Sequence, residues 1–182
     1  MTIKLTDRDK QILAFITEYK CASTSTIARL YFPSIATCEK RLRLLCDNKL
    51  LNRYRDNILT EYVYYKGSRP TNIKHSLAIS RVYSLLATEY QVLKCKREYE
   101  IKYKNKLIRS DLMAIVKLNG KIVPILFEIE LSKAYDNKYS DYISSGYWQQ
   151  LFGEKPIVVV ISNRTPKSSI PLHWYKLDNL DY

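Results

Sequence analysis

The dipeptide Asn119-Gly120 separates two long runs rich in aliphatic residues, 108–118 and 121–131. Asn-Gly is the strongest short signal for a two-residue β-hairpin loop, because both positions tolerate positive φ angles. Such a loop fixes how the flanking strands pair, so that Leu118 faces Lys121 and pairing proceeds outward one residue at a time. The sequence therefore predicts two antiparallel strands with a defined register.

Carried outward, this register sets Asp111 opposite Glu128 and Arg109 opposite Glu130, with all four side chains on one face. Opposed residues have Cβ atoms about 5 Å apart, where two carboxylates repel each other unless a cation lies between them. Mg²⁺ or Mn²⁺ prefers carboxylate oxygens and can activate water for attack on a phosphodiester. We therefore predict a metal site formed by Asp111, Glu128 and Glu130, with pairing to Arg109 as the alternative role of Glu130.

Two further residues bear on this acid cluster. Lys133 follows the second strand and is a candidate to stabilise charge that builds on a phosphate, although a lone lysine there is also typical of a solvated surface. Pro124 lies within the second run and cannot donate a ladder hydrogen bond. A bulge at Pro124 is the alternative that would shift the register by one residue.

The first third of the chain predicts three helices and a hairpin. Thr6 and Asp9 form a capping pattern that opens a helix to Tyr19, and the Ser/Thr cluster 23–26 caps a second helix that Pro33 ends. A third helix is expected over 35–48. Strands are then expected over 51–55 and 60–65, joined by a turn at Asp56-Asn57.

This order of elements is that of a winged helix, in which the third helix enters the major groove of DNA. Basic residues cluster on the third helix and on the first hairpin strand. We predict that these residues contact DNA: Lys40, Arg41, Arg43, Arg53 and Arg55. A winged helix used for protein contacts is the alternative, because charged faces are common on any exposed helix.

The stretch Gly67-Ser68-Arg69-Pro70 is typical of a short linker, so we expect two domains, 1–66 and 71–182. The second should be an α/β domain of order αβββαβ with a mixed sheet. Its expected helices are 73–90 and 133–148, and its expected strands are 93–103, 108–118, 121–131, 157–162 and 173–177.

Composition favours a polyanionic partner. Lysine and arginine number 30 against 18 acidic residues, a net charge of +12 that is spread over both halves of the chain. The four cysteines, Cys21, Cys38, Cys46 and Cys95, show no metal-ligand spacing and predict buried, reduced thiols. No signal peptide or membrane-length apolar run is evident, so we expect a cytoplasmic protein with no membrane partner.

Several segments resemble the plasmid replication-relaxation family, which includes the MOB-C class of conjugative relaxases. They are Leu5-Thr6-Asp7-Arg8-Asp9 with Ile12-Leu13, the stretch 27–33 (IARLYFP), and His75-Ser76-Leu77-Ala78. The resemblance implies a PD-(D/E)XK nuclease-like second domain, whose pattern of one Asp, then Glu-x-Glu, then Lys is matched by Asp111, Glu128, Glu130 and Lys133. Lys138 competes with Lys133 for the lysine position.

Two main hypotheses follow. The first is a relaxase or nicking endonuclease that uses Mg²⁺ or Mn²⁺ to cut duplex DNA at a transfer or replication origin, in company with other mobilisation or replication proteins. The second is a plasmid regulator or relaxase accessory factor that binds DNA without cutting it. A tyrosine nucleophile among Tyr135, Tyr139 and Tyr142 is a third possibility, with packing on the sheet as the competing explanation of their helical spacing.

Overall fold

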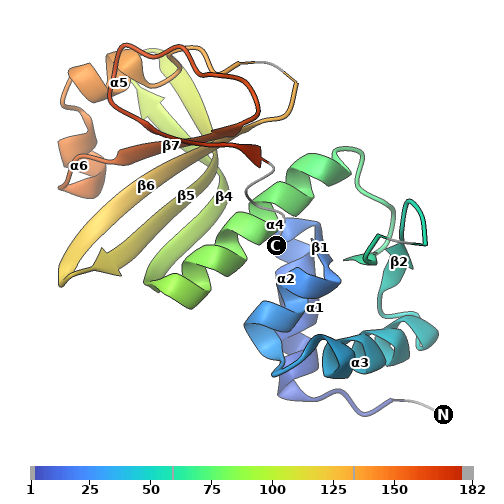
Figure 1. Ribbon diagram of the computed structural model, residues 1–182. Helices are drawn as coiled ribbons and strands as arrows, with labels where there is room; N and C mark the ends of the chain where they lie inside the picture. The colour runs from blue at the N-terminus through green and yellow to red at the C-terminus, as the bar shows by residue number, and fades with distance from the viewer. Residues whose placement is uncertain (1–2, 59, 133, 178–182) are drawn as a thin grey trace. The chain divides into compact units, whose positions relative to one another are not determined.

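The computed structural model describes residues 3–58, 60–132 and 134–177, and it is a mixed α/β protein (Figure 1). The chain divides into two compact units, Met1–Thr88 and Glu89–Tyr182. No helix in the described residues is both long enough and apolar enough to cross a bilayer. All four cysteines are free thiols; Cys21 and Cys38 are buried as predicted, whereas Cys46 and Cys95 are half-buried.

The first unit combines four helices with a small antiparallel sheet of order β1-β3-β2. The expected helices and hairpin are present. β1 was not predicted, because three residues are too few to show an alternating pattern. The elements are α1 (Asp7–Tyr19), β1 (Cys21–Ser23), α2 (Thr24–Tyr31), α3 (Ile35–Asp47), β2 (Asn52–Tyr54), β3 (Val63–Tyr65) and α4 (Ile73–Glu89).

The starts of the first three helices follow from capping side chains. Thr6 accepts a hydrogen bond from the Asp9 amide, and the Asp9 carboxylate accepts one from the Thr6 backbone amide, which confirms the predicted capping box. Ser23 and Ser34 cap α2 and α3 in the same way, each accepting from the amide three residues on. These bonds satisfy amides that have no partner within the helix.

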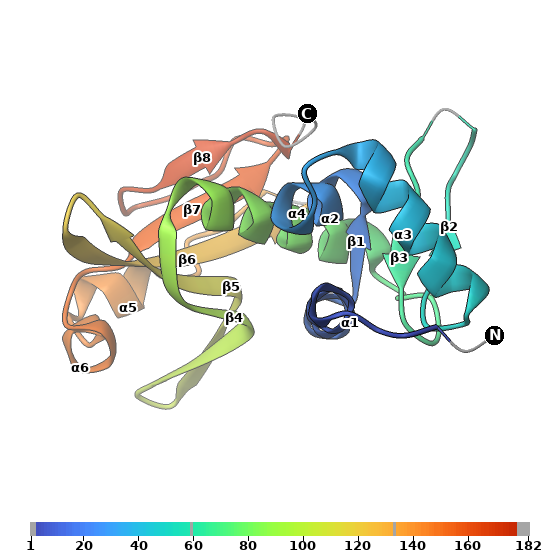
Figure 2. The same ribbon diagram turned by 90° about the horizontal axis from the view of Figure 1, so that it is seen from below.

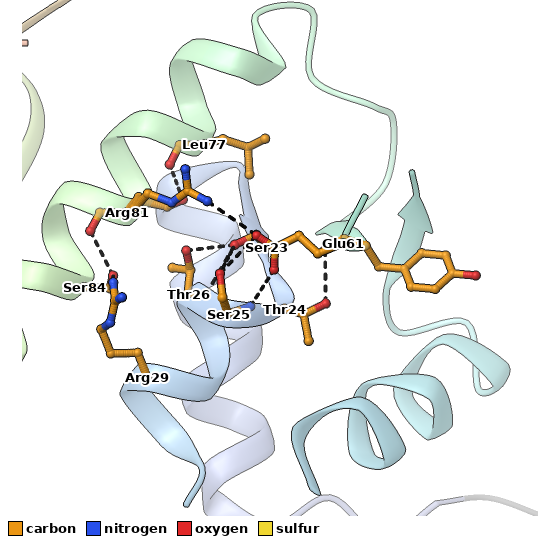
Figure 3. A network of polar contacts seen from close by, with 11 residues as sticks. Ser23, Thr24, Ser25, Thr26, Arg29, Glu61, Leu77, Arg81 and Ser84 are labelled. Atoms are coloured by element: carbon orange, nitrogen blue, oxygen red, sulfur yellow. Dashed lines mark hydrogen bonds and ion pairs between the residues drawn. The ribbon is translucent and has the colours of Figure 1, made fainter. Parts of the chain in front are cut away.

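Helix α4 packs within the first unit through a polar network shown in Figure 3. The Glu61 carboxylate accepts hydrogen bonds from the Ser25 amide at 2.8 Å and from its hydroxyl at 3.0 Å, and it also pairs with Arg81 of α4 at 3.4 Å. Arg29 of α2 donates to Ser84 of α4 at 3.2 Å. The network therefore joins α2, the hairpin and α4.

Apolar contacts reinforce this placement of α4. Ile73 is buried in one cluster with Cys21 and Val63, and the Tyr83 ring lies 4.9 Å from the ring of Tyr19. We expected the domain boundary at 67–70 and this helix in the second domain. The expected linker instead lies inside the first compact unit, because both sides of it contribute to one core.

The second unit is a five-stranded sheet of order β4-β5-β6-β7-β8, which Figure 2 shows edge to edge. β4, β5 and β6 are antiparallel neighbours, while β6, β7 and β8 run parallel, so the expected mixed sheet is confirmed. The elements are β4 (Gln91–Tyr103), β5 (Lys106–Leu118), β6 (Lys121–Glu130), α5 (Ser140–Ser144), α6 (Trp148–Phe152), β7 (Ile157–Ser162) and β8 (His173–Tyr175).

The predicted register of β5 and β6 is confirmed from the loop to Leu112; the predicted pairs of Asp111 with Glu128 and of Arg109 with Glu130 lie beyond the end of this ladder. Asn119 and Gly120 have φ angles of 50° and 79°, as a two-residue loop of this kind requires. Pairing runs without a shift from Leu118 opposite Lys121 to Leu112 opposite Phe127. Pro124 lies in register within this ladder, so the bulge considered for it does not occur.

The helix expected over 133–148 is wrong. Two five-residue helices, α5 and α6, flank a turn in which Gly146 has a φ of 72°. Upstream, Asp136 bridges to Lys167, and the Asn137 side chain accepts a hydrogen bond from the Ser169 amide at 2.6 Å. These contacts hold the segment before α5 in a non-helical conformation that ends in a turn, and they come from residues too distant in sequence to be read from helical spacing.

Candidate functional site

A groove lies between α3 and the β2–β3 hairpin. α3 buries Cys38, Leu42 and Leu45 completely on one side, which leaves its other side to line the groove. The groove residues come from both elements and from the strand-flanking position 62. They are Ala36, Glu39, Lys40, Arg43, Arg53, Tyr62 and Tyr64.

The cations of α3 in this groove have free head groups. Lys40 and Arg43 are exposed, and neither makes a hydrogen bond or ion pair with any other residue that the structure describes. A free ammonium and a free guanidinium retain all their donors for an external acceptor. Two of the five basic residues predicted to bind DNA are thus available in one groove.

The hairpin adds two arginines that share one aromatic ring. The guanidinium carbon of Arg53 lies 4.5 Å from the centre of the Tyr62 ring, and that of Arg55 lies 4.7 Å from it. Stacking on an aromatic face restricts a guanidinium while leaving its N–H edge able to donate. Arg55 also donates to the Ile58 carbonyl at 3.4 Å. The hairpin therefore presents two partly ordered cations beside the groove.

Arg41, also predicted to contact DNA, has a different partner. Its Nε donates to Asp9 at 2.8 Å, and its Nη2 binds the other oxygen of the same carboxylate. Asp9 is fully buried, and Arg41 does not line the groove. Arg41 holds α3 against α1, and its guanidinium is occupied by Asp9.

Arg69 lies in the stretch whose composition predicts a linker, and it is a further basic residue near the hairpin. Its guanidinium lies 3.6 Å from the centre of the Tyr54 ring. Because successive strand residues point to opposite faces, Tyr54 and Arg53 face opposite ways. Arg69 therefore lies on the other face of the hairpin, and nothing in its local sequence indicated this contact.

Glu128, one of the three acids predicted to bind a metal, is buried in the second unit and has two hydrogen-bond partners. Glu128 is 2% exposed; its Oε2 accepts from Lys138 Nζ at 2.7 Å, and its Oε1 accepts from the Tyr139 hydroxyl. The Asp111 carboxylate accepts from the Ile129 amide at 2.7 Å. Burial raises the pKa of Glu128 to about 7, and the nearby charge of Asp111 raises it too, while Lys138 and Tyr139 act in the opposite direction.

This arrangement does not fit a resident Mg²⁺ or Mn²⁺ ion. Within 3–58, 60–132 and 134–177 no three His, Cys, Asp or Glu side chains form a group able to hold a metal, so Asp111, Glu128 and Glu130 are not assembled into one. Both oxygens of Glu128 already accept hydrogen bonds, one from Lys138 and one from Tyr139. Arg109, considered as an alternative partner of Glu130, forms an ion pair with Glu100 of β4, with 3.5 Å between Arg109 Nη2 and Glu100 Oε1.

The lysine at this cluster is Lys138. It is the residue that competed with Lys133 in the family pattern, and its side chain is 34% exposed. Lys133 lies outside the described residues.

The three tyrosines considered as nucleophiles are buried in the core beside this cluster, as the packing interpretation predicted. Tyr135, Tyr139 and Tyr142 are each no more than 1% exposed. Burial raises the pKa of Tyr135 to about 12 and that of Tyr139 well above its ordinary value. Tyrosine hydroxyls that resist ionisation and face the core are poor nucleophiles.

Replacing Asp111 with Asn is expected to weaken the pH dependence of stability. The pKa of Glu128 is about 7 in the folded chain against 4.5 ordinarily, so the unfolded chain ionises first and the free energy of unfolding falls as pH rises between these values. Asp111→Asn removes one cause of the raised pKa, so the fall should shrink by about 1 kcal/mol. Urea unfolding at several pH values measures this.

The matched control is Glu100→Gln, which removes an exposed carboxylate from the neighbouring strand. This variant should keep the wild-type pH dependence. An equal change in both variants would mean that overall charge, rather than the Asp111 carboxylate, governs the titration of Glu128.

Comparisons with protein-family models and with curated proteins each found no match. Among solved structures, the crystal structure of protein VC1899 from Vibrio cholerae aligns with 98% of this chain, with 13% sequence identity and a TM-score of 0.42. The chain covers 55% of that protein, or about half its length. A likeness at this level carries no argument about function.

Proposed function

We propose that this protein binds duplex DNA through a winged helix formed by its first unit, with α3 in the major groove and the β2–β3 hairpin as the wing. The observation that carries the proposal is the groove in which Lys40, Arg43 and Arg53 come together. Lys40 and Arg43 have no partner among the described residues, and phosphate oxygens are acceptors that such head groups bind.

The order of elements supports this proposal. Three helices are followed by a hairpin, and β1 after α1 completes a sheet of order β1-β3-β2. A winged helix uses the helix before the hairpin for DNA, and that helix here is α3. The net charge of +12 also supports a polyanionic partner such as DNA.

We further propose that the second unit is a nuclease-like domain that does not cleave DNA. The antiparallel strands β4 to β6, followed by β7 parallel to β6, support the nuclease-like part. The hydrogen bonds of Glu128 support the absence of cleavage. Protein donors bind both oxygens of its carboxylate, so neither oxygen is free to bind a catalytic metal ion. Of the two hypotheses from the sequence, a DNA-binding regulator or accessory factor is the one that this geometry favours.

Fluorescence anisotropy with a labelled 30-base-pair duplex tests DNA binding. If several phosphates are contacted, the affinity should fall by on the order of a thousandfold between about 50 and 200 mM salt. A single strand of the same sequence is the control, because a helix in the major groove requires a duplex. Affinity that does not change with salt contradicts the proposed groove.

A supercoiled-plasmid assay tests the second part. We expect no relaxation of the plasmid by the wild-type protein with Mg²⁺ or Mn²⁺ at concentrations that saturate DNA binding. Nicking that depends on Mn²⁺ and is lost in Asp111→Asn would overturn the proposal and favour the metal-dependent endonuclease.

A further inference from the structure

Glu39 is an acidic side chain in the groove whose other charged lining residues are Lys40, Arg43 and Arg53. Arg43 follows it by four positions on α3, a spacing at which oppositely charged side chains commonly pair. Glu39 is exposed, yet among the described residues no hydrogen bond or ion pair involves its carboxylate. Its carboxylate is therefore free to accept a hydrogen bond from a ligand.

A free carboxylate in a phosphate-binding groove weakens binding to every duplex, because it repels the backbone. Such a carboxylate strengthens binding only where a hydrogen-bond donor on a base edge faces it. In the major groove, the amino group of cytosine offers such a donor to Glu or Asp, whereas the amino group of adenine lies beside the acceptor N7. The chemistry of Glu39 thus suits cytosine.

The place of Glu39 on the helix fits contact with a base. It lies in the N-terminal half of α3, one turn after the small residue Ala36, which also lines the groove. The N-terminal residues of a recognition helix are those that reach base edges. We propose that Glu39 determines specificity by accepting a hydrogen bond from the amino group of cytosine in duplex DNA, an inference that rests on the proposed function.

Selection from a random duplex library, followed by sequencing of the bound fraction, tests this proposal. Wild type should select cytosine at one position, with about tenfold weaker binding when another base replaces it. Glu39→Gln should select adenine at the same position, because an amide both donates to N7 and accepts from the adenine amino group. Glu39→Ala should lose the preference without gaining another.

Asp47→Asn is the matched control. Asp47 is the last residue of α3, exposed and outside the groove, so its substitution changes the same charge on the same helix. We expect it to retain the cytosine preference.

The outcomes separate the two proposals. A wild-type protein that retains no duplex contradicts the proposed function itself. A wild-type protein that binds duplexes, but selects the same bases as Glu39→Gln or none at all, overturns the role of Glu39 and leaves DNA binding intact. Equal tightening of every duplex by Glu39→Gln and Asp47→Asn likewise reduces Glu39 to a general charge effect.

Discussion

Reversing the charges of Lys40 and Arg43 to glutamate should lower the affinity for duplex DNA by at least about a hundredfold at low salt. Both head groups lie in the groove between α3 and the hairpin without a partner among the described residues, so their reversal converts two attractions into repulsions. The slope of log affinity against log salt should also fall by about 1.8, the contribution of two phosphate contacts. Anisotropy titrations at several salt concentrations measure both quantities.

The double reversal of Lys10 and Lys20 is the control for net charge. Both side chains are exposed, lie outside the groove and carry the same total charge. Their reversal should reduce affinity only a few-fold through the long-range field. If both double variants bind DNA equally weakly, the affinity depends on the net positive charge of the chain, and the prediction that α3 contacts DNA is wrong.

Removing the Asp9 carboxylate should destabilise the first unit by about 3 kcal/mol or more. In Asp9→Ala, Arg41 loses both bonds to its partner, and Thr6 loses the acceptor of its backbone amide and hydroxyl, each 2.7 Å from the carboxylate in the wild type. Breaking a buried ion pair from one side leaves the other charge uncompensated. Chemical denaturation followed by circular dichroism gives the free energy of unfolding.

Asp7→Ala provides the comparison, because Asp7 lies in the same first turn but its side chain is 91% exposed. Its pair with Lys10 is a surface pair, and its loss should cost at most about 0.5 kcal/mol. Equal destabilisation by the two substitutions would show that the charge of the first turn matters and the buried pair does not.

The Asp9 pair also has a pH signature. The hydrogen bonds from Arg41 hold the pKa of Asp9 at about 2, below the ordinary 3.8. The pair therefore contributes its full stability above about pH 4, and the contribution is lost as pH falls toward 2, because the unfolded chain takes up a proton first. Asp9→Asn should remove this acid-dependent loss.

The features that the sequence predicted correctly are those determined by residues close together in the chain. The Asn119-Gly120 loop allows few backbone conformations, so it set the pairing of β5 and β6 as far as Leu112 and Phe127. The Thr6 capping box likewise depends on residues three apart. These features needed no knowledge of the rest of the fold.

Features that depend on distant partners were missed. The pairing of Arg41 with Asp9 spans 32 positions, and the bond of Asn137 to Ser169 spans the same number. The spacing of the tyrosines resembled a helix, but Tyr135 and Tyr139 are buried from a non-helical segment that ends in a turn before α5. At the acid cluster, the pattern correctly placed Asp111 near Glu128 and included Lys138 among the candidates for the lysine, but nothing in it indicated that the Tyr139 hydroxyl would bind the second oxygen of Glu128.

The packing of α4 into the first unit has a consequence for how this module could be exchanged between proteins during evolution. A segment ending at Lys66 would leave behind Ile73, Arg81 and Ser84, and with them part of the core and two polar anchors. Recombination within the Gly67–Pro70 stretch would thus separate the first three helices and the hairpin from α4, although the composition of this stretch is typical of a linker. The segment that can be exchanged as a folded unit extends to Thr88. Proteins that carry this module beside a different second domain should therefore have their junctions after α4.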